Sequence, residues 1–160
     1  PPALKQDMQS GAMGAARERR IMGAVIEWPE MLEHIDQTFF ALTFTAKGLN
    51  RLQTTLLSYF SRTKAVEKSA MLAHIEAQGL EHILRELRRD RRLTTAAMGG
   101  PDATLEDRTA LWNTEADALQ GPIQEARARE DTKSRLADTI REDNADALQR
   151  LMRASRSDRE

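Results

Sequence analysis

The sequence contains no cysteine, which excludes disulfides, thiolate zinc sites, iron–sulfur clusters and cysteine nucleophiles. Aromatic residues are only 4% of the chain, a composition that disfavours all-β sandwiches and barrels. Neither sign of charge is in surplus, because 24 Lys and Arg face 25 Asp and Glu. A strongly basic nucleic-acid binder would show such a surplus, so we expect direct nucleic-acid binding to be weak or absent. No apolar run approaches the length that spans a bilayer, and the N-terminus has no signal-peptide pattern, so we expect no membrane association.

The composition is that of a polar chain that can still bury a core. Its 160 residues are 40% hydrophobic and 31% charged, with a mean hydropathy of −0.60. That length suits one domain, or one small domain with an appended helical element. The chain begins at Pro1 rather than Met, so we expect it to be part of a longer protein. Residues 1–16 hold two prolines and two glycines and predict a flexible lead-in.

Helical spacing of apolar residues dominates residues 17–100. Ile21 and Val25, like Met22 and Ile26, lie one helical turn apart. Proline or glycine then separates one short helix from the next, at Pro29, Gly48 and Gly79. The apolar run from residue 39 to 44 has no second strand to pair with and predicts a buried linker. The pattern indicates a bundle of short helices that ends at the break spanning residues 98–102.

Residues 101–160 predict a subdomain built from a long helix. Thr104, with Asp107 three residues on, forms a weak capping box at its start. Only Gly121-Pro122 disturbs the helical pattern up to Ile140, and this pair predicts a kink or an interruption. The segment 141–144 is a candidate turn, and the segment 145–154 is helical again. We therefore expect an all-α fold, a bundle of short helices followed by a long-helix or helical-hairpin C-terminal subdomain.

No constellation of a catalytic, metal or cofactor site is present. The three histidines, His34, His74 and His82, are not spaced as metal ligands on one helix face. No glycine-rich loop follows a strand to cradle a phosphate, and no nucleophile elbow is found. The carboxylates alternate with arginines, which is typical of a solvated helix face. The sequence thus predicts no enzyme activity, no cofactor and no small-molecule substrate.

Two further features each have two interpretations. One is a run of arginines that is either a phosphate-contacting patch or a helix end that favours cations through its dipole: Arg85, Arg88, Arg89, Arg91 and Arg92. The other is a set of apolar residues that either packs within a hairpin or binds a partner: Leu136, Ile140, Leu148, Leu151 and Met152.

The opening helix pair, residues 17–32, resembles the start of the C-terminal domain of bacterial DnaG-type primases, and alphaproteobacterial members in particular. The similarity runs through the Leu49-Asn50-Arg51-Leu52 helix and Trp112 to the turn and helix that follow Glu142. It covers residues 17–154 in order, spacing and length. The chain departs from the family pattern at Gly121-Pro122, and at Glu27-Trp28-Pro29, where the family has Asn-His-Pro.

The resemblance implies a module without catalytic function that docks on the N-terminal domains of the replicative DnaB-type helicase, in the bacterial cytoplasm at the replication fork. The parent protein would be a DNA primase, whose zinc and magnesium would belong to its other domains. The terminal hairpin would be the main helicase contact. Within it we expect the contact residues to be Ile140, Leu148, Arg150, Leu151, Met152 and Arg153. The alternatives are the N-terminal domain of a replicative helicase, a small helical regulator that binds nucleic acid, or a small helical enzyme.

Overall fold

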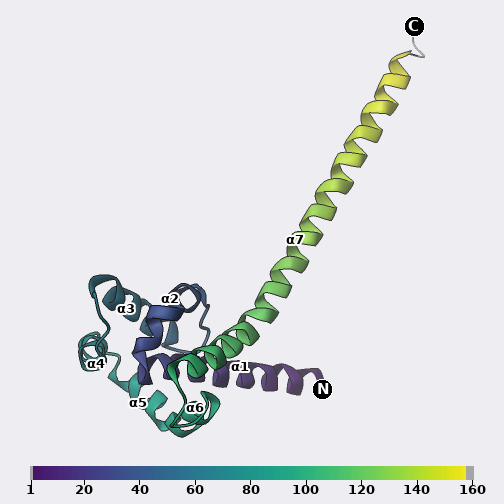
Figure 1. The fold of residues 1–160 in the computed structure, drawn as a ribbon. Helices are drawn as coiled ribbons and strands as arrows, with labels where there is room; N and C mark the ends of the chain where they lie inside the picture. The colour runs from purple at the N-terminus through teal and green to yellow at the C-terminus, as the bar shows by residue number, and fades with distance from the viewer. Residues whose placement is uncertain (1, 158–160) are drawn as a thin grey trace. The chain divides into compact units, whose positions relative to one another are not determined.

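Helices account for nearly all of the regular structure. The computed structural model describes residues 2–157, and the side chains of residues 13–122 and 124–156. In this part of the chain there are seven α-helices, one short 3-10 helix and no strand. Figure 1 shows the α-helices with their labels. The all-α prediction is therefore confirmed. The chain divides into two compact units, Pro1–Gln120 and Gly121–Glu160.

The first helix, α1 (Pro2–Glu27), is the central element of the first unit. It contacts the short η1 helix (Pro29–Met31), α3 (Leu49–Arg62), α4 (Lys68–Ala77), α5 (Glu81–Arg89) and α6 (Arg91–Ala97). Residues 21–26 are all buried, as expected for a helix that neighbours surround on every side. The structure also corrects the predicted flexible lead-in, because residues 2–16 belong to α1. The alanines, Gln and Met of this segment are good helix formers, and Pro2 occupies the first turn, where proline costs no hydrogen bond.

Pro29 separates α1 from the next helices, as predicted. The η1 helix begins at Pro29 and leads directly into α2 (Leu32–Ala41). Phe39 and Phe40 lie in α2 rather than in the expected linker, which is confined to residues 42–48. Leu42 and Phe44 are buried in that linker, so its buried character is confirmed.

Two glycines set the boundaries of the following helices. Gly48 precedes α3 with a φ of 84°, and Gly79 follows α4 with a φ of 75°, a region that favours glycine. A Cβ atom at Gly48 would also clash with Cδ1 of Ile83. Both helix boundaries follow from the sequence. The short α6 helix, which begins directly after Asp90, was not predicted as a separate element.

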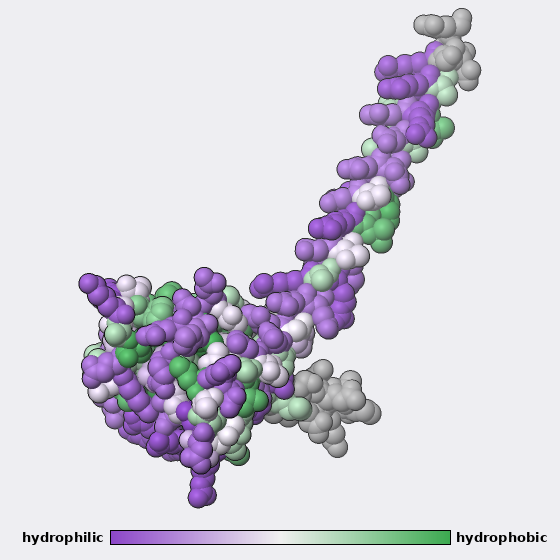
Figure 2. All heavy atoms as spheres, in the orientation of Figure 1, coloured by the Kyte–Doolittle hydropathy of each residue, from purple (hydrophilic) through white to green (hydrophobic). Residues whose placement is uncertain are grey.

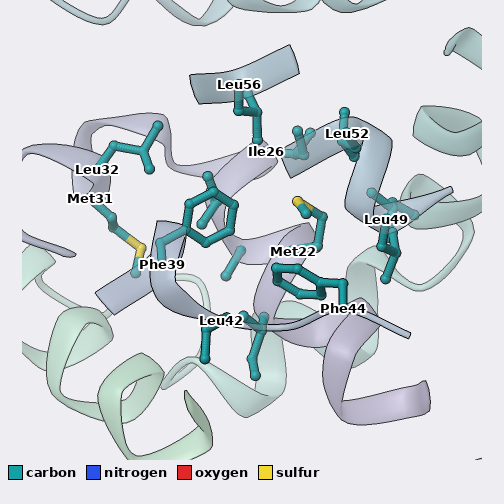
Figure 3. Close-up of a cluster of buried hydrophobic side chains, with 14 of the residues drawn as sticks. Met22, Ile26, Met31, Leu32, Phe39, Leu42, Phe44, Leu49, Leu52 and Leu56 are labelled. Atoms are coloured by element: carbon teal, nitrogen blue, oxygen red, sulfur yellow. The ribbon is translucent and has the colours of Figure 1, made fainter. Parts of the chain in front are cut away.

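One hydrophobic core holds the first unit together. It contains side chains from α1, η1, α2, the following linker, α3, α4, α5 and the beginning of α7 (Leu105–Ser157). The close-up in Figure 3 shows the side chains from the earlier elements converging on Phe39, with Met22, Leu42 and Phe44 beside it. Phe39 makes tilted ring contacts with Phe44 and Trp112, at centroid distances of 5.9 and 6.2 Å.

The beginning of α7 is anchored to α1. Trp112 is fully buried, and its indole Nε1 donates a hydrogen bond to the carbonyl oxygen of Ile21 at 3.1 Å. Glu115 forms ion pairs with Arg17 at 3.0 Å and with Arg20 at 3.4 Å. The hydroxyl of Thr104 accepts a hydrogen bond from the backbone amide of Asp107, which confirms the predicted N-terminal cap.

A buried carboxylate fixes the linker after α2. The Glu18 side chain is 2% exposed and accepts hydrogen bonds from the backbone amide and hydroxyl of Thr45 and from the backbone amide of Ala46. These bonds satisfy an acceptor that would be costly to bury alone. The sequence did not indicate this contact, because the partners lie on different elements.

The described residues do not form the helical hairpin that was predicted for the C-terminal part of the chain. The α7 helix is continuous from Leu105 to Ser157, passing through Gly121, Pro122 and the segment 141–144. The long-helix form of the prediction is confirmed, whereas the turn at 141–144 is wrong. That segment contains no glycine or proline, and the helix propensities of its residues differ from alanine by less than about 1 kcal/mol each. Without a tertiary contact to favour folding back, the helix continues. The chain divides into units at Gly121, within α7, and the loop at 98–104 only separates α6 from α7.

Candidate partner-binding surface on the C-terminal helix

The second unit presents a row of exposed apolar side chains on α7. Five large side chains are 53–68% exposed, and we call them the apolar face of α7: Leu136, Ile140, Leu148, Leu151 and Met152. In Figure 2 hydrophobic groups lie along one side of this part of the helix and hydrophilic groups along the other. Four of the five belong to the contact residues expected from the sequence. Leu136 was not in that set, although its position one turn before Ile140 is the signal that identifies it.

Helical geometry places the five side chains on one broad face. Successive residues of an α-helix are rotated by about 100°. Leu136, Ile140 and Leu151 therefore fall within a narrow sector, and Leu148 and Met152 extend it to one side. Ala147 lies in the same sector. The spacing of these residues alone defines the face. Because α7 is continuous through residues 141–144, the side chains before and after that segment remain on the same side of the helix.

The two arginines of the expected contact set occupy different sides of the helix. Arg150 borders the sector of Leu136 and Ile140, whereas Arg153 is rotated about 200° from Leu151 and lies on the opposite side. Both are exposed. Arg150 can therefore flank a partner on the apolar face, while Arg153 belongs to the polar side.

The charges along this part of α7 are segregated. Residues 138–146 contain four acidic side chains, Asp138, Glu142, Asp143 and Asp146, and one basic side chain, Arg141. Residues 147–156 contain three arginines and no acidic residue. A partner bound to this surface would therefore contact apolar side chains flanked by an acidic segment at one end and an arginine segment at the other. This difference between the two ends favours one orientation of the partner over the other.

The other candidate residues are dispersed. His34 and His82 are exposed, and His74 is half-buried with its ring 5.9 Å from that of Tyr59. No cluster of three or more histidine, aspartate or glutamate side chains suited to a metal ion is found among the described residues. No helix within the described residues is long and apolar enough to cross a membrane.

The arginine run spans the end of α5 and the start of α6. Arg88 and Arg89 lie in the last turn of α5, where cations interact favourably with the helix dipole. Arg85 pairs with Glu81 at 3.5 Å, and Arg91 pairs with Glu27. These contacts favour the interpretation of the run as a charged helix end.

An open hollow in the first unit was not predicted. It lies between α2 and the first turns of α7 and has a volume of about 530 Å³. Its lining residues are His34, Leu105, Glu106, Thr109, Ala110 and Asn113. The α7 residues lie on one side of its first turns, and only their pairing with His34 of α2 depends on the tertiary structure.

Comparisons of this chain with models of protein families, with curated proteins and with solved structures find no match.

Proposed function

We propose that this chain is a docking module, the helicase-binding domain of a bacterial DnaG-type primase, and that it binds the N-terminal domains of the replicative DnaB-type helicase. In this role it brings priming to the replication fork in the bacterial cytoplasm and modulates both enzymes without chemistry of its own. The primase resemblance of residues 17–154 supplies the identity of the partner.

One structural observation supports the proposal above all others. The apolar face of α7 is uncovered along its whole length, whereas most large apolar residues of the first unit are buried in one core. The exposed large apolar residues of the first unit are spread over α1, α3, α6 and the start of α7: Met13, Leu57, Leu93, Leu105 and Leu111. Exposed leucines that gather on one face of an amphipathic helix are typical of helix-in-groove recognition. In this proposal the first unit is a folded domain with its own core, and the second unit carries the surface that binds the helicase.

The physical basis of binding would be burial of that face. Full burial of a leucine side chain is worth about 1.5–3 kcal/mol, so Leu148 and Leu151 together can supply the centre of an interface. Arg150 at the edge would add a charge that steers association more than it strengthens the complex. This predicts that salt slows association while leaving the apolar contribution in place.

The direct test is a calorimetric titration of this chain against the replicative helicase of the same organism, and against the isolated N-terminal domain of that helicase. We expect saturable binding to both. The double variant Leu148→Asp plus Leu151→Asp should abolish binding, because each substitution places a charge at the centre of the buried surface. Its thermal unfolding followed by tryptophan fluorescence, which reports on the first unit, should remain that of the unsubstituted chain, since both residues are exposed and lie in the second unit.

A matched control separates a surface effect from a charge effect. Thr139→Asp plus Gln149→Asp adds the same two charges to the exposed polar side of the same helix. This control should bind with nearly unchanged affinity. Equal loss in both double variants would contradict the apolar face as the contact surface. If the unsubstituted chain binds neither helicase titrant, the docking proposal is wrong, and binding to DNA would then favour the nucleic-acid regulator.

A further inference from the structure

The part of α7 that carries the apolar face also contains a heptad pattern that suits pairing of two helices, and Ile140 and Leu151 belong to both sets. Residues at alternating spacings of three and four form a seam of small and apolar side chains around one asparagine: Ala137, Ile140, Asn144, Ala147, Leu151 and Ala154. All described side chains from residue 124 to 156 are exposed, so nothing within the second unit covers this seam. A polar helix with a narrow apolar seam gains most of its stability from packing against another helix.

We propose that, in the absence of another partner, the seam is covered by the same segment of a second copy of this chain, and that the two helices pair in the antiparallel orientation. The pairing would join residues 137–154 of each copy, centred between Ala145 and Asp146. In this register Leu151 packs against Ile140 of the second copy, Asn144 against its Ala147, and Ala137 against its Ala154. The large residues Ile140 and Leu151 thus meet each other, Ala137 meets Ala154, and Asn144 lies against the small Ala147.

Charge complementarity selects the orientation. In a parallel pair the acidic segment 138–146 would lie beside the same acidic segment of the second copy, and the arginines of 147–156 beside one another. In the antiparallel pair the acidic segment lies beside the arginine segment at both ends. Asp143 is then next to Arg150 of the second copy, on the edge of the seam, and the symmetry makes this contact twice. The same orientation brings the aliphatic stem of Arg141 over Leu148 of the second copy.

The absence of cysteine from the chain permits a direct test of the register. Two single-cysteine variants of the full chain, Ile140→Cys and Leu151→Cys, are mixed and oxidised with glutathione disulfide. One variant carries a tag that shifts its mobility on a gel. The antiparallel register predicts a mixed disulfide between the two variants, and little of the Leu151→Cys homodimer. A Thr139→Cys variant, on the polar side of the helix, gives the background level of crosslinking.

A charge exchange tests the orientation without a crosslink. Asp143→Arg or Arg150→Asp alone should raise the dissociation constant of the dimer roughly fivefold, because each creates a like-charge contact at two symmetry-related positions on the edge of the seam. The combination of both substitutions in one chain restores opposite charges and should restore the affinity. Sedimentation equilibrium over a range of protein concentrations measures these constants.

Several results would overturn the proposal. A Leu151→Cys homodimer as the main product would indicate parallel pairing. Crosslinking at the background level, or a mass of 18.0 kDa at every concentration of the unsubstituted chain, would mean that the seam does not pair with itself. No helicase is present in these experiments, so their outcome is independent of the proposed function.

Discussion

At the scale of single residues, buried polar groups distinguish this first unit from a purely apolar bundle. Glu18 and Thr94 are the buried polar residues among the described part of the chain, and they are in opposite situations. Glu18 is satisfied by Thr45 and Ala46. The hydroxyl of Thr94 is buried without a hydrogen-bond partner, against Gly23 of α1. A satisfied buried group fixes a local arrangement, and an unsatisfied one lowers stability.

Substitution of Glu18 should destabilise the first unit. Glu18→Ala leaves the backbone amides of Thr45 and Ala46 without their acceptor, which should cost about 2 kcal/mol of unfolding free energy. Glu18→Gln retains one acceptor oxygen and should cost less than the alanine variant. Urea unfolding followed by tryptophan fluorescence measures both values. An unchanged midpoint for Glu18→Ala would show that water replaces the carboxylate without penalty.

Thr94 should respond in the opposite direction. Thr94→Val keeps the shape of the side chain and removes its unpaired hydroxyl, so it should raise the unfolding free energy by about 1 kcal/mol. Thr94→Ser is the control, because it keeps the hydroxyl and removes a methyl group, and should lower the stability. Urea unfolding of both variants gives the comparison. A destabilised valine variant would contradict the assignment of an unsatisfied hydroxyl.

At the scale of elements, α7 has two parts with different sources of stability. Its first turns are fixed by the cap at Thr104, the buried Trp112 and the ion pairs of Glu115. Beyond residue 124 every described side chain is exposed, and the helix depends on its own hydrogen bonds and on pairs such as Arg129 with Glu125. Pro122 lies inside the helix and removes one backbone donor where these two parts meet.

The cap at the start of α7 provides the element-scale prediction. Thr104→Ala removes the acceptor for the Asp107 amide and should lower the unfolding free energy of the first unit by about 1 kcal/mol. Thr104→Asn preserves a capping oxygen and should be close to neutral. Denaturant unfolding followed by tryptophan fluorescence is suitable, because both tryptophans, Trp28 and Trp112, lie in the first unit. Equal stability of the two variants would mean that the cap contributes nothing.

At the scale of the whole molecule, the two units differ in kind. The first unit has a core of its own, and the second is a single helical segment with no buried side chain among its described residues from 124 onward. Stability should therefore reside in the first unit, and the second unit should be available for binding.

Removal of residues 121–160 tests this division. The shortened chain should retain the thermal midpoint of tryptophan fluorescence within a few degrees, since the last buried side chains of α7, Trp112 and Ala116, remain. A control that ends the chain after residue 104 also removes Trp112 and should fail to give a cooperative transition. A large drop in the midpoint of the chain that ends at Gln120 would show that the second unit stabilises the first.

Features that depend on neighbours along the chain were predictable from the sequence. Pro29 restricts the backbone, whereas Gly48 and Gly79 permit the positive φ found at the helix ends beside them. These helix boundaries follow from such local properties. The spacing of Leu148 and Leu151 likewise defines an apolar face without reference to any other segment. Most of the candidate surface could be predicted in this way, because a helix face is a property of a short segment.

Features that depend on distant residues required the folded chain. The contacts of Glu18 with Thr45, and of Trp112 with Ile21, join segments that no local pattern relates. The segment 141–144 illustrates the effect of a long-range contact that is missing. Its residues permit either a turn or a helix at nearly equal free energy, and only a packing contact could favour the turn. Since the described residues of the second unit make no such contact, the helix continues and its apolar face stays exposed.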